Sequence, residues 1–222
     1  MHSLQLYTAK RTGDLRVTGS YTFSKALTDS NGALDNPEDP FNRRFNYGPA
    51  SFDRRHVFVS TYTYAVPFIR ESNGLVRALL SGYEVSGITG LQTGQFYTVI
   101  SETSIGQRRA DYIGGQVNLP SGEQSINRWF NNAAFAPASN IRRGTSGAGI
   151  VEGPGLQLWD VSVRRRFSIT EDVRLLLQAD LFNAFNRANF LAVNVNASNP
   201  EFGSVTSAAP GRNIQFGIKL SF

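Results

Sequence analysis

Acidic side chains recur in three stretches of the chain in which polar and apolar residues alternate. Asp160 and Asp180 lie in two consecutive stretches of this kind, and Glu84 lies in an earlier one. Paired carboxylates can serve as general acid and base. The same stretches carry three arginines that could neutralise the carboxylates instead: Arg164, Arg166 and Arg174. Ion pairing is the more ordinary arrangement, so the sequence predicts no enzyme and no catalytic residue.

Other residue patterns that could support chemistry are weak. His2 and His56 are the two histidines, and neither has the context of an activated nucleophile. The glycine-rich run GAGIVEGPG (147–155) has no strand–turn–helix around it, so a phosphate site is not indicated. The acidic run DSNGALDNPED (29–39) does not match a calcium-binding loop, and the chain has no cysteine. We expect no metal and no cofactor.

The alternation that positions these side chains is clearest at the end of the chain, in NIQFGIKLSF. Its apolar residues occupy every second position: Ile214, Phe216, Ile218, Leu220 and Phe222. A period of two is typical of a β-strand with one apolar and one polar face. Six earlier segments repeat the pattern with varying clarity: 3–11, 15–25, 56–66, 82–94, 156–167 and 173–182.

Two features interrupt this all-β pattern. Trp159, Val161, Val163 and Phe167 share one predicted face, and Arg165 is the exception among them. Near a strand end, such an arginine could extend its charged group to an interface. A helix is indicated only for a short stretch around Leu75–Leu80.

The connections between the predicted strands differ in length. Thr12–Asp14 and Thr170–Asp172 are tight turns. The connections that alternate with them are long and cover residues 29–51, 93–155 and 186–212, whereas 67–80 is intermediate. An antiparallel meander with short turns at one rim and long loops at the other is typical of membrane β-barrels. Soluble sandwiches usually have shorter loops.

Composition is compatible with a membrane sheet without demanding one. The chain has 222 residues, of which 41% are hydrophobic and 12% aromatic. No apolar run approaches the ~18 residues of a transmembrane helix. The net charge of +5 comes largely from arginine pairs. No nucleic-acid-binding module accompanies them, so we favour solvated or interior charge over a nucleic-acid partner.

An alternative from another functional class is a secreted, soluble all-β binding domain of the carbohydrate-binding type. The two possibilities differ in what covers the face that carries Trp159, Val161, Leu175 and Ile218. A second sheet would cover it in a sandwich, whereas lipid would cover it in a membrane barrel.

Several stretches, in order along nearly the whole chain, resemble one family. They are SYTFSKALTD, NPEDPFNRRFNYGPASFDRRHVFV, SGITGLQTGQFYTV, RWFNNAAFAP, GPGLQLWDVSVRRRFSI, LQADLFNAFNRANF and FGSVTSAAPGRNIQFGIKLSF. They are similar to the C-terminal part of the barrel of TonB-dependent outer-membrane receptors of the Oar-like type. The resemblance implies the cell outer membrane, a barrel of ~22 strands filled by an N-terminal plug, and ligand import driven through TonB. It does not identify the ligand.

The resemblance also implies that residues 1–222 are a part of such a receptor. About seven strands are predicted, whereas a bacterial single-chain barrel has an even number and at least about eight. The start, MHSLQLYTAKR, has no features of a secretory signal, and neither a plug nor a TonB-binding segment is recognisable. We therefore expect a partial transmembrane barrel that does not close alone, with TonB reached only through the missing N-terminal part.

In the family that the chain resembles, the outer-membrane assembly machinery recognises the last strand, with its terminal aromatic residue. The residues of this chain that match are Phe216, Ile218, Leu220 and Phe222. An unpaired edge strand can add to another sheet, and its alternating side chains supply specificity. The expected partners are thus outer-membrane lipid and the barrel-assembly machinery.

Overall fold

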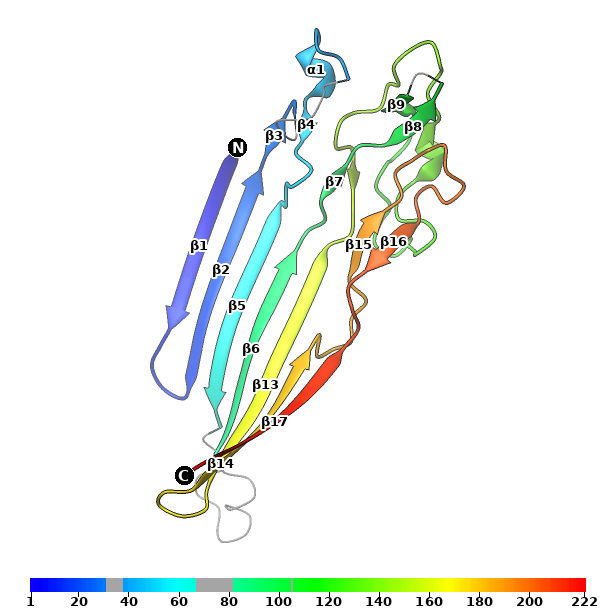
Figure 1. Cartoon of the computed structure of the whole chain (residues 1–222). Helices are drawn as coiled ribbons and strands as arrows, with labels where there is room; N and C mark the ends of the chain where they lie inside the picture. Colours follow the sequence, from blue (N-terminus) through cyan, green and yellow to red (C-terminus); the bar gives the residue numbers. More distant parts are fainter. Residues whose placement is uncertain (31–37, 67–81, 105) are drawn as a thin grey trace.

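The computed structural model describes residues 1–30, 38–66, 82–104 and 106–222. Its main feature is one antiparallel sheet whose seven strands follow the order of the chain (Figure 1). The strands are β1 (His2–Lys10), β2 (Leu15–Lys25), β5 (His56–Ala65), β6 (Tyr83–Gln92), β13 (Leu156–Ser168), β14 (Arg174–Phe182) and β17 (Asn213–Ser221). The sequence prediction of an up-and-down meander is therefore confirmed.

The register of the sheet keeps apolar residues beside apolar residues. Val85, Val163, Ala179 and Phe216 are successive partners in one row across four strands. The next row across the same strands is polar and consists of Ser86, Ser162, Asp180 and Gln215. Because side chains alternate between the two faces of a sheet, neighbouring rows point in opposite directions. The alternation in the sequence thus becomes one apolar face and one polar face.

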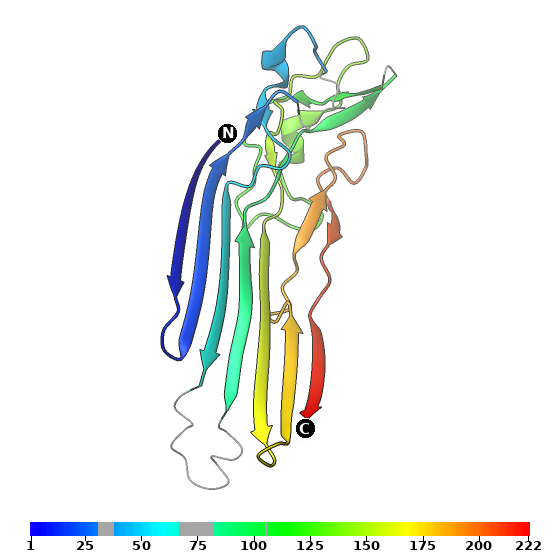
Figure 2. The same cartoon turned by 60° about the vertical axis from the view of Figure 1, so that its left-hand side comes forward.

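Short turns and long connections lie at opposite ends of the sheet (Figures 1 and 2). Residues 11–14 join β1 to β2, with Gly13 at a positive φ of 80°. Residues 169–173 join β13 to β14, where Ile169 donates its N–H to the carbonyl of Val173. We call this end, which also holds the C-terminus, the turn rim, and the opposite end the loop rim. The helix expected around Leu75–Leu80 lies outside the described residues.

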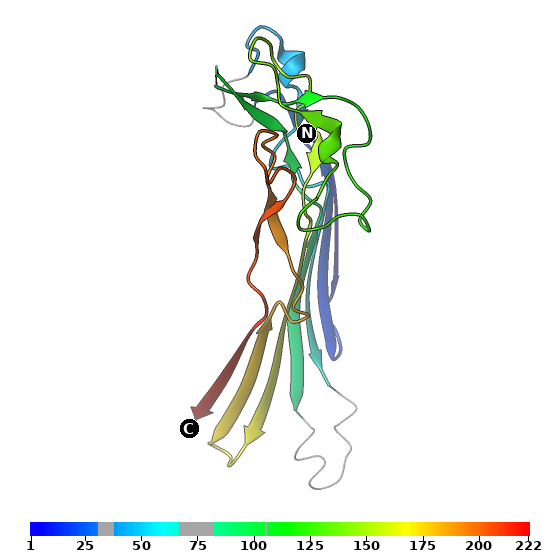
Figure 3. The same ribbon diagram turned by 90° about the vertical axis from the view of Figure 1, so that its right-hand side faces the viewer.

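The seven-stranded sheet forms a single curved layer (Figure 3). The other sheets of the described residues are two-stranded ribbons in the long connections. They pair β3 (Leu27–Thr28) with β4 (Gly48–Pro49), β7 (Phe96–Tyr97) with β12 (Val151–Glu152), β8 (Ile100–Thr103) with β9 (Gly106–Arg109), β10 (Asp111–Tyr112) with β11 (Phe135–Ala136) and β15 (Phe190–Val193) with β16 (Val205–Ala208). None of these ribbons covers the apolar face as the second layer of a sandwich would. The described residues therefore do not form the two-layered sandwich expected of the alternative, a soluble binding domain.

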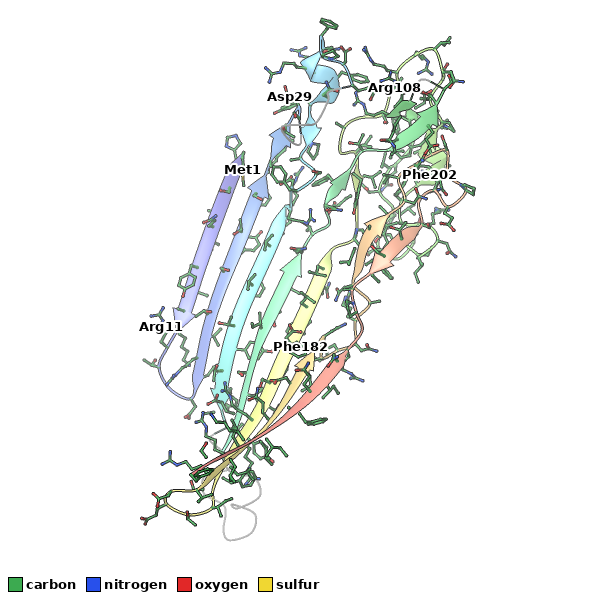
Figure 4. All side chains as sticks on the ribbon, in the orientation of Figure 1. Met1, Arg11, Asp29, Arg108, Phe182 and Phe202 are labelled. Carbon is green, nitrogen blue, oxygen red and sulfur yellow. The ribbon has the colours of Figure 1, made fainter. Side chains whose placement is uncertain are left out.

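The buried apolar cluster of the described residues lies in the long connections. We call the described parts of 26–55, 93–155 and 183–212 the cap. Its core consists of Val99, Ala110, Phe130, Ala134, Phe135, Val151 and Val193. The fully buried Phe130 ring meets Phe202 edge-on, with 5.2 Å between ring centroids (Figure 4 labels Phe202). The sequence predicted long loops here but not this core.

Two short helical segments complete the cap, α1 (Arg43–Asn46) and the 3-10 turn η1 (Asn132–Ala134). In the part of the chain that the structure describes, no helix is long and apolar enough to cross a membrane.

The glycine-rich run 147–155 has a packing role in the cap. A Cβ atom on Gly94 would lie 1.8 Å from the carbonyl oxygen of Gly153, and one on Gly48 would lie 2.2 Å from that of Ala148. These backbones approach one another more closely than any side chain would allow. The run therefore lets three cap segments pack together.

The two faces of the sheet predict opposite responses to an added charge. Ala179 lies on the apolar face of β14, and its neighbour Gln178 lies on the polar face. In a lipid bilayer, Ala179→Arg should reduce the free energy of unfolding by about 2–4 kcal/mol if this row lies near the bilayer midplane. Gln178→Arg is the matched control and should be tolerated. Folding titrations into lipid vesicles measure both, and equal costs would contradict the assignment of the faces.

Candidate functional site

The apolar face of the sheet carries aromatic residues near both ends. Trp159, toward the loop rim, meets Phe185 edge-on, with 5.5 Å between ring centroids. Tyr83 and Phe167 lie toward the turn rim, where β6 begins and β13 ends. The seven strands contain 9 to 13 residues each, and ~9–11 residues cross a bilayer when tilted. Aromatic side chains at both ends of an apolar band are typical of a surface that faces lipid.

Arg165 is the exception on this face, as the sequence predicts. Its guanidinium carbon lies 4.0 Å from the centroid of the Phe167 ring and 4.9 Å from that of Tyr83. The side chain is almost completely buried. Aromatic faces attract a cation electrostatically, and more strongly where water is excluded. The two rings thus shield the charge close to the turn rim.

The polar face holds a cavity of about 390 Å³ between β5, β6, β13 and β14. Its polar lining is Thr61, Thr63, Ser86, Asp160, Ser162, Arg164 and Asp180, and Ile88 and Phe182 add apolar surface. Figure 4 labels Phe182 on the sheet. Asp160 and Asp180, the two carboxylates that the sequence analysis considered as a pair, therefore line the same cavity.

The charged side chains of this cavity already have partners within the protein, through hydrogen bonds and one ion pair. The Nε of Arg164 lies 2.9 Å from Oε1 of Glu84. Asp160 accepts the backbone N–H of Asn183 at 2.8 Å, and Asp180 accepts two hydrogen bonds from the Gln178 amide. The prediction of neutralising ion pairs is thus correct for Arg164. Among the described residues Arg166 and Arg174 form no ion pair with a carboxylate, so for them it is wrong.

His56 takes part in an aromatic cluster. Its Nδ1 lies 2.7 Å from the hydroxyl of Tyr21, and its ring lies 5.2 Å from the ring of Phe23. The register places all three residues on the apolar face near the loop rim. His56 therefore belongs to the group of aromatic side chains at the loop-rim end of the apolar face.

The last strand, β17, forms an edge of the sheet and carries the residues predicted as an assembly signal. Its one neighbour among the described strands is β14, where Ile218 lies opposite Leu177 and Leu220 opposite Leu175. The side chains of the predicted set are strongly exposed, from Leu220 at 55% to Phe222 at 98%. An edge strand with free backbone groups and bare apolar side chains can accept another strand.

Ion pairs between distant segments hold the cap together. The Nε of Arg109 lies 3.1 Å from Oε2 of Glu38, and both side chains are largely buried. Asp39 pairs with Arg143 at 2.7 Å. The guanidinium of Arg109 also lies 3.4 Å from the centroid of the Phe45 ring. The acidic run that we considered for calcium thus contributes carboxylates that tie the first long connection to the second.

A further pair, Arg142 with Asp111, joins two parts of the second connection at 2.6 Å. The Arg142 guanidinium lowers the pKa of the Asp111 carboxyl below its ordinary value, and hydrogen bonds from Thr145 add to the effect. The sequence shows these arginine pairs but not their partners, because the partners lie far along the chain.

A comparison with protein families identifies the chain. Residues 1–215 match the family described as outer membrane beta barrel domain. The chain belongs to this family. Its place is therefore the cell outer membrane. In barrels of this kind the apolar face meets lipid and the polar face lines the interior. Among curated proteins, no relative matches the chain.

The Asp111–Arg142 pair predicts an acid-labile cap. A carboxyl whose pKa is lower in the folded state stabilises that state above its unfolded pKa, and this contribution is lost as the pH falls through the folded pKa. Protease resistance of the cap in the whole protein should therefore decrease below about pH 4. Asp111→Asn should reduce resistance at neutral pH and flatten the acid dependence, whereas Glu123→Gln, an exposed control, should leave both unchanged. An unaltered acid profile in Asp111→Asn would contradict the role of this pair.

Proposed function

We propose that this chain is the C-terminal part of the barrel of a TonB-dependent receptor of the Oar-like type, which imports a ligand across the outer membrane. The observation that carries the proposal is a seven-stranded sheet whose two edges have no neighbour among the described strands and which bears a large folded cap at one rim. Since outer-membrane barrels place long loops outside the cell, the cap is the outward face. An elaborate outward face is what a receptor requires. We propose no enzymatic role.

Strand direction supports a larger barrel. All neighbouring strands of the sheet are antiparallel and there are seven of them, so β1 and β17 run in the same direction. Antiparallel closure therefore needs an odd number of further strands. A receptor barrel of ~22 strands would supply roughly 15 more, which satisfies this condition. A second copy in the same orientation would have to join β17 to β1 in parallel, which an up-and-down barrel does not allow.

The test of TonB dependence uses the whole protein that contains this chain, solubilised from outer membranes. It should be retained by the immobilised periplasmic domain of TonB, and deletion of the segment ahead of the plug should abolish retention. In a planar bilayer the same protein should keep a closed baseline, because a plug fills the barrel. Absence of capture, or a steady open-pore conductance, would contradict the proposal.

We further propose that the barrel-assembly machinery binds β17 through its exposed apolar residues. Phe222 follows the strand, and it is 98% exposed, so it contributes almost nothing to packing within the sheet. Its position fits a recognition residue better than a stabilising one. A strand edge of this kind fits a partner that pairs with its backbone and contacts alternate side chains.

Deletion of Phe222 should therefore lower membrane insertion of the whole protein several-fold and leave its refolding in detergent unchanged. Phe222→Trp should largely restore insertion, because an aromatic ring suits the interface, whereas Phe222→Asp should behave like the deletion. The measurement is the fraction of heat-modifiable, folded protein in outer-membrane preparations. Normal membrane levels for the deletion would mean that Phe222 is an ordinary terminal residue.

A further inference from the structure

A second cavity lies at the loop rim, where the cap joins the sheet. It has a volume of about 500 Å³, within the range of small-molecule sites. Its lining comes from the first long connection and from the end of β6 with the segment after it: Ser51, Phe52, Arg54, Gln92, Gln95, Phe96 and Tyr97. Gln92 lies on the polar face of β6, which is the interior side. We call this cavity the vestibule pocket, because it opens where the cap meets the barrel interior.

Aromatic rings form the apolar part of the vestibule pocket. Phe52 is 64% exposed, so most of its ring surface is open to a ligand. Phe96 and Tyr97 are half-buried, and the guanidinium of Arg55 lies 5.0 Å from the Phe96 ring centroid. Exposed aromatic side chains around a concave site are typical of surfaces that take up a planar or apolar group.

Arg54 supplies the charge of the vestibule pocket. Its guanidinium donates to three neutral oxygens: the Ser51 carbonyl, the Asp53 carbonyl and, at 2.8 Å, Oε1 of Gln95. The Asp53 carboxylate is instead paired with Arg55, at 3.1 Å. Among the described residues, no carboxylate forms an ion pair with Arg54. Burial lowers the pKa of Arg54, which is the sign of a cation that has lost part of its water, although the nearby Asp53 carboxylate acts in the opposite direction.

A chain of hydrogen bonds fixes the polar side of the vestibule pocket. Arg54 donates to Gln95, the Gln95 amide donates to the Tyr97 hydroxyl, and Tyr97 donates to the carbonyl of Leu191. Leu191 belongs to the third long connection, so the network links all three parts of the cap. Groups held in place in this way lose little freedom on binding a ligand.

We propose that the vestibule pocket binds a small aromatic carboxylate, with its carboxylate on Arg54 and its ring against Phe52 and Phe96. The planar guanidinium can donate two parallel hydrogen bonds to a carboxylate, and a partly desolvated cation gains most from an anionic partner. As an entry site for import, the vestibule pocket rests on the proposed function. As a binding site it can be tested without transport.

The test compares benzoate with its neutral isostere benzamide on the whole protein in lipid nanodiscs. Saturation-transfer NMR gives the two affinities, and empty nanodiscs correct for partition into lipid. Since hydrogen bonds to charged groups contribute about 1.5–3 kcal/mol, benzoate should bind at least about ten-fold more tightly than benzamide. Arg54→Gln should remove this preference, and Arg54→Lys, which keeps the charge, should retain part of it.

Two further variants separate the roles of ring and charge. Phe96→Ala should weaken both probes alike, because the ring contact is common to them. The control is Arg128→Gln, which removes an exposed arginine of the second long connection, outside the vestibule pocket. It should change neither affinity. Equal binding of the two probes, or a preference that survives Arg54→Gln, would overturn the proposal. A failure of TonB capture alongside an intact benzoate preference would reject the import function but not this site.

Discussion

The structure depends on one constraint: inside a bilayer, every backbone N–H and C=O group must find its partner within protein. The seven strands satisfy one another along six antiparallel interfaces. The outer edges of β1 and β17 have no neighbour among the described strands. Since open edges are not stable in lipid, the proposal that this sheet is part of a larger closed barrel meets the same constraint. The antiparallel pairing of neighbouring strands meets that requirement within the sheet.

Lipid and cap stabilise different parts of the chain. The described strands of the sheet bury few large apolar side chains, as expected of a face whose solvent is lipid. The cap, by contrast, has the buried apolar core that a water-exposed structure requires, centred on Phe130. Ion pairs such as Glu38 with Arg109 then join its segments. The vestibule pocket lies where these two environments meet.

The sequence predicted the sheet well because a period of two is a local signal that survives in any environment. All seven strands and the exceptional position of Arg165 were predictable in this way. The cap was not, because its contacts join residues far apart in the chain. Arg109 binds Glu38 across 71 positions, and Tyr97 binds Leu191 across 94. Arg166 and Arg174 likewise show that an arginine beside carboxylates on a predicted face need not pair with them.

The most direct test of this account is to measure the solvent on each face of β13. The chain has no cysteine, so single cysteine substitutions at positions 160 to 164 can each carry one spin label, once any cysteine elsewhere in the whole protein is replaced by serine. With the whole protein in lipid vesicles, collision with oxygen should be favoured at 161 and 163, and collision with a water-soluble nickel complex at 160, 162 and 164. Such a period of two would confirm that lipid covers the apolar face. Uniform accessibility, or the reverse alternation, would contradict it.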